Sequence, residues 1–361
     1  MRGWTKLAGI VLASAIVALH PGRGMAQVAT EAPLPVANAP APRIEAIKIH
    51  SREIAGNLLG TSAEREVYVV LPPSYDRQPK RRYPVVYALH GYSIDAAQWL
   101  KEIHVPDTVA AAFAKGTPEM IMVFPNSKNE YGGAFYSNSV TTGNFENFIA
   151  DELIEYIDAH YRTIARPEAR GLVGHSMGGY GAARIGILRA ERFGALYLMS
   201  PCCLSALGTQ GLTGNDAARI GALTSIAAAK DLPFKFAGPL AISAAFAPNP
   251  HNPPLFVDLP VDDQGKERPD IIAKRAANAP LDFLDQYIAK VRRYRAIGMD
   301  VGDQDTLVGD TTRMHEALDA YGIGNRFEVY SGTHTSRVAF RFQDNVLPFF
   351  GRALSFVQPR R

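Results

Sequence analysis

Short, uninterrupted apolar runs alternate along this chain with stretches of helical periodicity. A strand that is apolar at every position is buried on both faces, which is typical of a parallel sheet covered by helices on both sides. Between the runs, apolar residues recur at every third or fourth position, as at Phe145, Ile149 and Leu153. The pattern predicts a doubly wound, mostly parallel α/β domain. The five runs are Pro84–Leu89, Met120–Phe124, Gly171–Val173, Ala195–Met199 and Ala296–Met299.

Two further segments, Arg43–Ser51 and Glu66–Leu71, alternate apolar and polar residues and predict antiparallel or edge strands. One stretch breaks the rhythm, because residues 202–293 are helical and loop-like and contain a cluster of prolines. A connection of this length is often a lid or a binding loop. We expect an insert here that leaves and rejoins the sheet at or close to its carboxyl edge and forms a wall of a ligand pocket there. A purely structural buttress is the alternative.

The N-terminus has the layout of an export signal. Arg2 and Lys6 precede an apolar run, Leu7–Leu19, and small residues at Gly24–Ala26 surround a cleavage position. Residues 1–26 therefore predict a signal peptide for export to the periplasm or the medium. A buried N-terminal helix or an uncleaved anchor is the alternative.

The proline-rich residues 27–43 predict a linker, and residues 44–361 the folded domain. No cysteine follows the first apolar run to carry a lipid, and no run reaches the roughly 20 residues of a membrane-spanning helix. We therefore expect no stable membrane anchor.

Composition excludes several classes. The chain has 361 residues, 47% of them hydrophobic, which allows a large core. Three of its 38 basic residues and none of its 35 acidic ones lie in residues 1–26, so the remainder is neutral and recruitment to nucleic acid is not expected. Two cysteines cannot build a disulfide scaffold or a cysteine-rich zinc site. A dinucleotide-binding loop fails at Arg184, which stands where the third glycine belongs.

The segment Gly174-His175-Ser176-Met177-Gly178 matches G-x-S-x-G between a predicted strand and a predicted helix. Such a turn lifts a serine above the sheet edge, and the flanking glycines remove Cβ clashes with neighbouring backbone. A serine hydroxyl is a weak nucleophile, so it needs a histidine base and an acid that orients the base.

The base is predicted to be His334, in a loop after the strand-like run Arg326–Tyr330. The other two downstream histidines fit less well, because His315 lies in a helical pattern and His251 in the proline cluster. The acid should follow the run Ala296–Met299.

Four aspartates follow or end that run. Asp300 belongs to the strand and Asp310 is expected to cap the next helix, so the choice lies between Asp303 and Asp305, which spacing does not separate. A metal site built from these carboxylates is the rival interpretation, although the sequence lacks a calcium-binding loop.

An acyl-transfer site also needs two backbone N–H donors where negative charge develops on the substrate oxygen. One is expected from Met177, directly after the serine, and the other from Tyr92, in the loop after Pro84–Leu89. We expect His90 to be a packed loop residue. No metal or other cofactor is required.

Together these motifs resemble the esterase D, antigen 85 and feruloyl-esterase branch of the α/β-hydrolases. The resemblance covers the chain from about Ile47 to the C-terminus, outside the variable stretch Cys203–Ala289. The resemblance implies an α/β-hydrolase fold and assigns the acid to Asp305, the aspartate of G-x-x-D. Thr333, Thr335 and Ser336 depart from the usual final loop. The matching elements are Leu89–Gly91, Phe135–Asn138, Gly143–Glu146, Asp151–Leu153, Gly174–Gly179, Gly302–Asp305 and Gly332–His334.

We therefore expect an exported serine carboxylesterase that forms an acyl-enzyme on Ser176 and acts on a small-molecule or carbohydrate-linked ester. An acyltransferase of the same fold, a peptidase and a non-catalytic binding module are the alternatives. The pocket is expected to include Trp99, Tyr136, Leu255 and Phe256, and the insert's Phe246 and Phe283 offer further apolar surface. Cys202 and Cys203 could pair only through a strained ring, so two buried thiols are expected.

Overall fold

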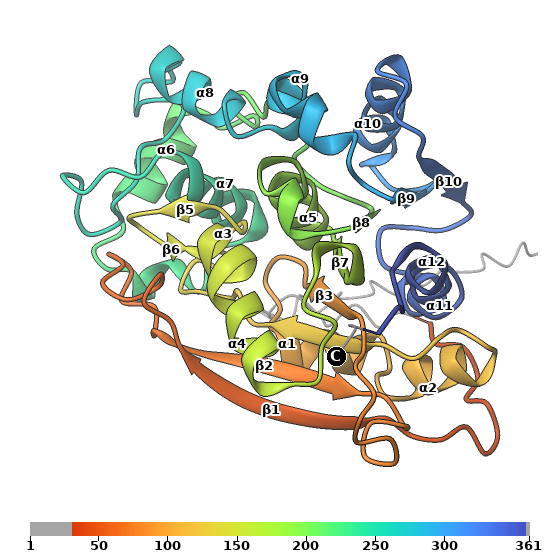
Figure 1. Cartoon of the computed structure of the whole chain (residues 1–361). Helices are drawn as coiled ribbons and strands as arrows, with labels where there is room; N and C mark the ends of the chain where they lie inside the picture. Colours follow the sequence, from red (N-terminus) through yellow and green to blue (C-terminus); the bar gives the residue numbers. More distant parts are fainter. Residues whose placement is uncertain (1–30, 359–361) are drawn as a thin grey trace, which may run out of the picture.

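A computed structural model describes residues 31–358 and has a central eight-stranded sheet in the order β1-β2-β4-β3-β7-β8-β9-β10 (Figure 1). From β4 to β10 all neighbouring strands are parallel, while β2 is antiparallel to both of its neighbours. The predicted fold class is confirmed. The strands are β1 (Arg43–His50), β2 (Glu64–Leu71), β3 (Val85–Leu89), β4 (Ile121–Pro125), β7 (Arg170–His175), β8 (Ala195–Met199), β9 (Ala296–Gly302) and β10 (Arg326–Tyr330).

The inner strands are parallel because both of their faces are covered. Every residue of β3, β4, β7 and β8 is buried, as their uninterrupted apolar runs predict. Strand β9 extends to Gly302, beyond its apolar run, and includes Asp300. A short hairpin of β5 (Asn138–Ser139) and β6 (Gly143–Asn144) lies outside the main sheet.

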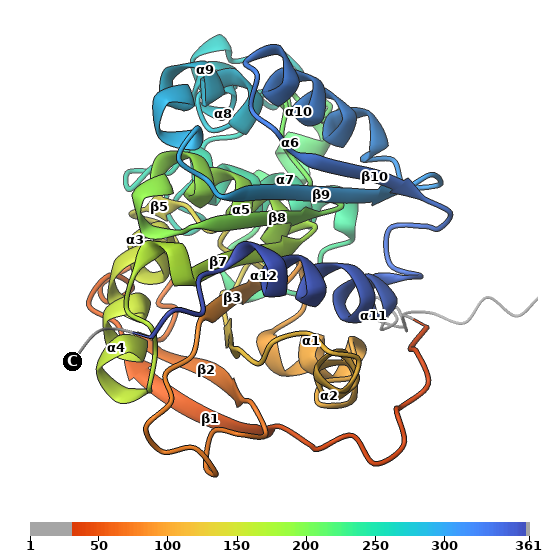
Figure 2. The ribbon, with the colours of Figure 1, turned by 45° about the vertical axis from the view of Figure 1, so that its right-hand side comes forward.

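Helices cover both faces of the sheet (Figure 2). One face carries α1 (Ala96–Glu102), α2 (Asp107–Ala114), α11 (Val338–Arg341) and α12 (Leu347–Ala353), the last two joined by a π-helical turn, Phe342–Val346. The other face carries α3 (Phe145–Asn147), a π-helical turn Phe148–Glu152, α4 (Leu153–His160), α5 (Met177–Leu188), α9 (Pro280–Val291) and α10 (Val308–Ala320). Three short 3-10 turns complete the set: Pro167–Ala169, Ala190–Arg192 and Ala227–Ala229.

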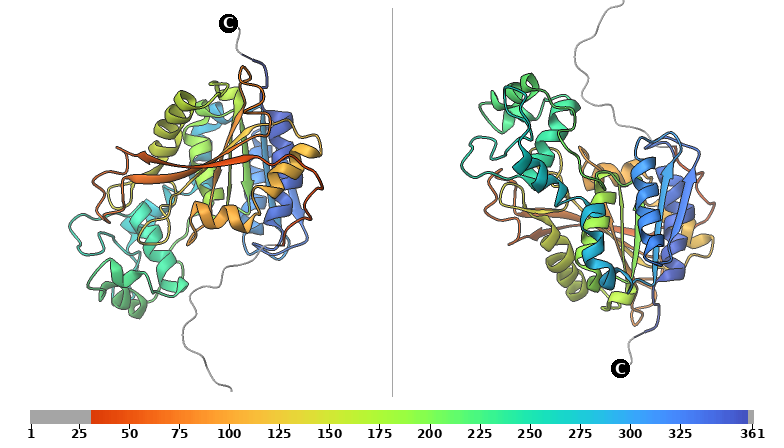
Figure 3. Two further views of the ribbon diagram at one scale, coloured as in Figure 1. Left: turned by 90° about the horizontal axis from the view of Figure 1, so that it is seen from below. Right: turned by 90° about the horizontal axis from the view of Figure 1, so that it is seen from above.

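The insert leaves the sheet after β8 and projects at one end of the molecule (Figure 3). It contains α6 (Gly214–Gly221), α7 (Phe234–Phe246) and α8 (Pro269–Ala276). The expected return at the carboxyl edge is wrong, because α9 is an ordinary crossover helix that packs on α5. It leads to the amino end of β9, where the N–H of Arg295 donates to the carbonyl of Gly194.

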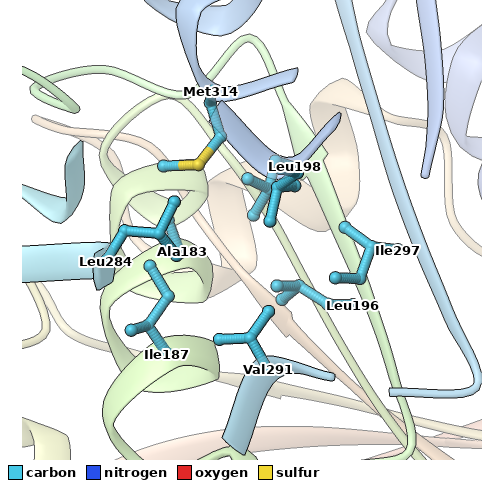
Figure 4. A pocket seen from close by; sticks show the side chains of 9 residues that line it. Ala183, Ile187, Leu196, Leu198, Leu284, Val291, Ile297 and Met314 are labelled. Carbon is cyan, nitrogen blue, oxygen red and sulfur yellow. The ribbon is translucent and has the colours of Figure 1, made fainter. Parts of the chain in front are cut away.

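A small apolar void lies between α5, α9, α10 and the sheet (Figure 4). Its volume of about 10 Å³ is close to the smallest that can hold one water molecule, and its lining offers that water no polar partner. The void is therefore a packing feature of the core. It is lined by Ala183, Ile187, Leu196, Leu198, Leu284, Val291, Ile297, Met314 and Leu318.

The predicted signal peptide, residues 1–26, lies outside the described residues. From residue 31 to residue 42 the predicted linker has no helix or strand, and β1 begins at Arg43. The linker is tied to the rest of the domain, since the N–H of Glu31 donates to the carbonyl of Ser336. Over residues 31–358 no helix has the length and apolar character needed to cross a membrane.

Candidate active site

Ser176 occupies a strained turn between β7 and α5. Its backbone has φ 58° and ψ −117°, in a region that side-chain-bearing residues rarely adopt. The turn requires glycine on both sides: a Cβ on Gly178 would overlap the carbonyl oxygen of Leu89, and one on Gly174 would overlap that of Gly178. The sequence therefore places Ser176 at the carboxyl edge of the sheet, at the start of a helix.

Three residues far apart in sequence meet at this turn. The Nε2 atom of His334 lies 2.9 Å from the Oγ of Ser176, and its Nδ1 lies 2.7 Å from the Oδ2 of Asp305. Asp305 follows β9 and His334 follows β10, at the same sheet edge as Ser176. The structure thus brings together the predicted nucleophile, base and acid in a continuous hydrogen-bonded chain.

The environment of Asp305 keeps its carboxylate charged. Burial would raise the pKa of Asp305, but the hydrogen bond and charge of His334 and the N–H of Leu307 outweigh burial, so the pKa lies below its ordinary value. The side chain of Asp305 is 1% exposed, whereas that of His334 is 35% exposed. The imidazole of His334 is therefore accessible to solvent, while the carboxylate of Asp305 is shielded from it.

The other aspartates near Asp305 have separate partners. Asp303 accepts the N–H of Gly332, in the loop that carries His334. Asp300 pairs with Arg341 and Tyr197 inside the core. Because the four carboxylates face different partners, they do not form the rival metal site. In residues 31–358 no three side chains of the usual ligand types come together in a metal-binding cluster.

The expectation that Asp310 caps its helix is wrong. Leu307 is the N-cap residue of α10, and Asp310 lies in the first turn. The Asp310 carboxylate instead accepts hydrogen bonds from the N–H and Oγ of Ser205, which ties the start of the insert to α10.

His175 contributes a contact that sequence reasoning missed. Its Nε2 lies 2.9 Å from the carbonyl oxygen of His334, and because a carbonyl only accepts, Nε2 carries the proton. Burial and the neighbouring His334 lower the pKa of His175 to about 3, so the ring is neutral. His175 therefore anchors the backbone of the loop that carries His334. The G-x-S-x-G motif leaves the position before the serine unspecified, so nothing in the motif indicates this contact.

The predicted oxyanion donors border Ser176. A Cβ on Gly91 would lie 3.5 Å from the Cβ of Ser176, so the loop after β3 passes beside the serine. Within residues 31–358 the N–H groups of Tyr92 and Met177 have no hydrogen-bond acceptor. Both therefore remain available to a substrate oxygen. His90 is buried and bonded to Gly91 and Ser127, as expected for a packed residue.

An aromatic cluster connects the insert to the oxyanion loop. The ring of Phe234, at the start of α7, lies edge-on to Tyr92 with centroids 5.9 Å apart. Behind Tyr92, the rings of Phe135, Tyr180 and Phe246 are in mutual contact. Phe234 is 60% exposed, so it presents an aromatic face beside the site. Sequence reasoning missed it, since nothing distinguishes Phe234 from other aromatic residues of the insert.

The predicted pocket residues fare unevenly. The prediction that Trp99 lines the pocket is wrong, because its side chain is 1% exposed and packs against Phe124 and Phe342 in the core. Tyr136 is fully buried, and its hydroxyl donates to the carbonyl of His90, so it supports the oxyanion loop instead of facing a ligand.

In the insert, Leu255 is also buried, and its carbonyl accepts a hydrogen bond from Tyr131. A side chain packed in this way cannot line an open pocket. Phe256 is half-buried, with φ 56°, and its carbonyl accepts from Thr141, so it remains a candidate. Phe246 and Phe283 belong to the core.

The strand order, with β2 as the antiparallel member, and the serine turn after β7 define an α/β-hydrolase fold. A family model named Esterase, with the description "Putative esterase", matches residues 60–345. The chain belongs to this esterase family.

Relatives and solved structures agree with this assignment. An esterase of Mycobacterium tuberculosis (strain H37Rv) is 32% identical over 122 residues, 33% of this chain and 25% of the relative. An endo-1,4-beta-xylanase/feruloyl esterase of Xylanibacter ruminicola is 32% identical over 139 residues, 37% of this chain and 19% of the relative. The alignments thus span a quarter or less of these relatives' length.

Among solved structures, a ferulic acid esterase aligns with a TM-score of 0.62 at 22% identity, covering 87% of this chain and 99% of that one. An S-formylglutathione hydrolase from Agrobacterium tumefaciens aligns with a TM-score of 0.59 at 16% identity, covering 88% and 97%. At these identities the likeness establishes the fold.

Proposed function

We propose that this chain is an exported serine carboxylesterase. The observation that carries the proposal is the chain of hydrogen bonds from the Oγ of Ser176 through His334 to the buried carboxylate of Asp305. On a strained turn beside two free N–H groups, this arrangement meets the geometric requirements of acyl transfer. Membership of the esterase family supports an ester as the bond that is cleaved.

In the proposed mechanism, the Oγ of Ser176 attacks the ester carbonyl while Nε2 of His334 takes its proton. Asp305 holds the imidazole in the tautomer that leaves Nε2 unprotonated, and stabilises the cation that forms. The N–H groups of Tyr92 and Met177 donate to the oxyanion. His334 then protonates the departing alcohol, and a water molecule, activated by the same histidine, releases the acid from Ser176.

The aromatic face beside the site suggests the kind of ester. An exposed ring at Phe234, edge-on to Tyr92, can pack on an aromatic acyl or alcohol group. Two of the similar proteins are named for feruloyl or ferulic acid esters, which carry such a ring. We therefore propose an aromatic-acid ester, free or linked to a carbohydrate, as the substrate class, with no nucleic-acid or membrane partner.

Export is proposed from the sequence of residues 1–26, whose basic start, apolar run and small-residue end match a cleaved signal. Fractionation of cells that express the full chain, followed by N-terminal sequencing, tests it. Protein outside the cytoplasm that begins near Gln27 supports export. Cytoplasmic protein with an intact Met1 end contradicts it.

Release of acid from feruloyl, acetyl and p-nitrophenyl esters tests the activity. Wild type should hydrolyse esters, and Ser176→Ala should lose turnover by several orders of magnitude while keeping its fold. Ser62→Ala, at an exposed serine in the loop before β2, is the matched control and should retain full activity. Equal rates for wild type and Ser176→Ala would overturn the serine mechanism.

A further inference from the structure

Cys202 and Cys203 are the only two cysteines of the chain, and their Sγ atoms lie 2.6 Å apart. Non-bonded carbon atoms pack at about 3.5–4.0 Å, and sulfur is larger than carbon. The two sulfurs are therefore closer than two independent thiols would be. Both side chains are half-buried, not fully enclosed as the sequence predicts. Small reagents can therefore reach them.

The local backbone already has the bend that such a pair needs. Neighbouring Cα atoms are about 3.8 Å apart, below the usual range for bridged cysteines, so a bond between adjacent cysteines requires an unusual conformation. Cys203 has φ 60°, in the left-handed region, and Ser200 three residues earlier has φ 39°. On the sequence alone, the strain of a bond between adjacent cysteines argues against a disulfide. In the structure, the backbone already has a strained conformation before any such bond forms.

We propose that Cys202 and Cys203 form a reversible vicinal disulfide by exchange with a small-molecule disulfide. The thiolate of Cys203, near the cationic Arg275, attacks one sulfur of that disulfide and expels a thiolate. This leaves a mixed disulfide on Cys203. The thiolate of Cys202 then attacks the sulfur of Cys203 and expels the second half of the oxidant as a thiolate. One S–S bond forms in the protein and one breaks in the oxidant, whose two halves leave as thiols carrying the two cysteine protons.

The pair lies on the segment that holds the Ser176 turn. The N–H of Ser176 donates to the carbonyl of Met199 over 3.1 Å, and the N–H of Cys202 donates to the carbonyl of Ser176 over 3.1 Å. A Cβ on Gly179 would lie 2.7 Å from the Cα of Pro201, so this segment also packs closely on α5. The backbone N–H and carbonyl of Ser176 are therefore both hydrogen-bonded to the segment whose conformation the disulfide would fix.

A bridge between adjacent residues closes almost no chain, so it adds little to global stability through loop entropy. Its effect is local. Oxidation should keep the Cys202 N–H directed at the Ser176 carbonyl, and reduction should let this contact loosen. Strained or exposed disulfides are the readily reduced ones, which suits a reversible pair.

Mass spectrometry of the folded full chain, equilibrated with mixtures of oxidised and reduced glutathione, tests bond formation. The oxidised protein should be about 2 Da lighter than the reduced one, resist iodoacetamide, and yield a peptide in which the two cysteines are linked to each other. Two alkylated thiols under oxidising conditions, or a disulfide-linked dimer, would overturn the proposal.

Ester hydrolysis tests the coupling to Ser176, and this part rests on the proposed function. Reduction of wild type should lower kcat by roughly 3- to 10-fold, as expected for a slightly misplaced nucleophile. The double variant Cys202→Ser, Cys203→Ser should give one rate under both conditions. An unchanged kcat in protein whose mass shows full reduction would overturn the coupling. A protein inactive in both states would contradict the esterase proposal and leave the mass result standing.

Discussion

The ring of His175 donates a hydrogen bond from Nε2 to the carbonyl oxygen of His334 over 2.9 Å, and the two ring centroids lie 4.8 Å apart. The residue before the serine thus fixes the backbone of the loop that carries the proposed base. Since burial and the neighbouring His334 lower the pKa of His175 to about 3, this donor stays neutral at neutral pH.

Replacing His175 should therefore act through the position of His334. His175→Phe removes the donor and should lower kcat by about 10- to 100-fold with little change in KM, because displacing a catalytic group by about 1 Å has effects of this size. His175→Gln keeps an N–H donor and should recover most of the loss. The pH profile above pH 5 should keep its shape in both variants. Equal kcat values for Phe and Gln would contradict a positioning role.

Substitutions of Asp305 and Asp303 should have very different effects on kcat. Asp305→Asn presents an amide to Nδ1 of His334 and favours the wrong tautomer, so kcat should fall toward the ~10⁴-fold known for such triads. Asp303→Asn keeps an oxygen for the N–H of Gly332 and should lower kcat by about tenfold at most. Steady-state kinetics of the two variants, compared with wild type, show which aspartate is the acid. The reverse ranking would move the acid to Asp303.

Two buried histidines should make stability depend on pH. Burial lowers the pKa of His90 to about 4 and, together with His334, that of His175 to about 3, from an ordinary 6.5. Between about pH 4.5 and 6 the unfolded chain binds protons at both sites and the folded chain does not. The free energy of unfolding should then decrease as pH falls, with each histidine contributing up to about 1.4 kcal/mol per pH unit.

Urea unfolding of wild type and His175→Phe over this pH range measures that dependence. The variant should have a shallower slope, by at most the contribution of one histidine. Parallel slopes for the two proteins would show that His175 has the same affinity for protons in the folded and unfolded chains.

The insert should affect specificity through Phe234. Phe234→Ala removes the ring beside Tyr92. For feruloyl esters it should raise the activation free energy that sets kcat/KM by about 1–3 kcal/mol, and acetyl esters should be little affected. Leu255→Ala is the control, because that side chain is buried and its loss should lower Tm and all rates alike. A uniform loss for Phe234→Ala across all esters would assign the residue a structural role only.

The sequence was sufficient for the parts of the site that depend on local backbone. The G-x-S-x-G motif between a strand and a helix indicates a turn that exposes its serine at the sheet edge. The strand-like runs before Asp305 and His334 indicate that these two residues lie at the same edge. The choice of Asp305 over Asp303 needed the family resemblance. In the structure it follows from which carboxylate faces the ring.

The errors concern side chains whose neighbours are distant in sequence. Trp99 lies on an amphipathic helix, but periodicity does not tell which surface that helix covers, and the ring packs into the core. The return of the insert to the sheet was placed wrongly because nothing in residues 202–293 marks where the insert ends and the crossover helix α9 begins. His175 and Phe234 were missed because each acts through a loop that only the fold brings near.

Covalent labelling of Ser176 tests the account most directly. Wild-type protein treated with a fluorophosphonate should gain one adduct, and peptide mapping should place it on Ser176. His334→Ala should react much more slowly, since the hydroxyl loses its base. Ser176→Ala should gain no adduct. An undiminished adduct on Ser176→Ala, or an adduct mapped to another residue of wild type, would contradict the assignment of Ser176 as the nucleophile.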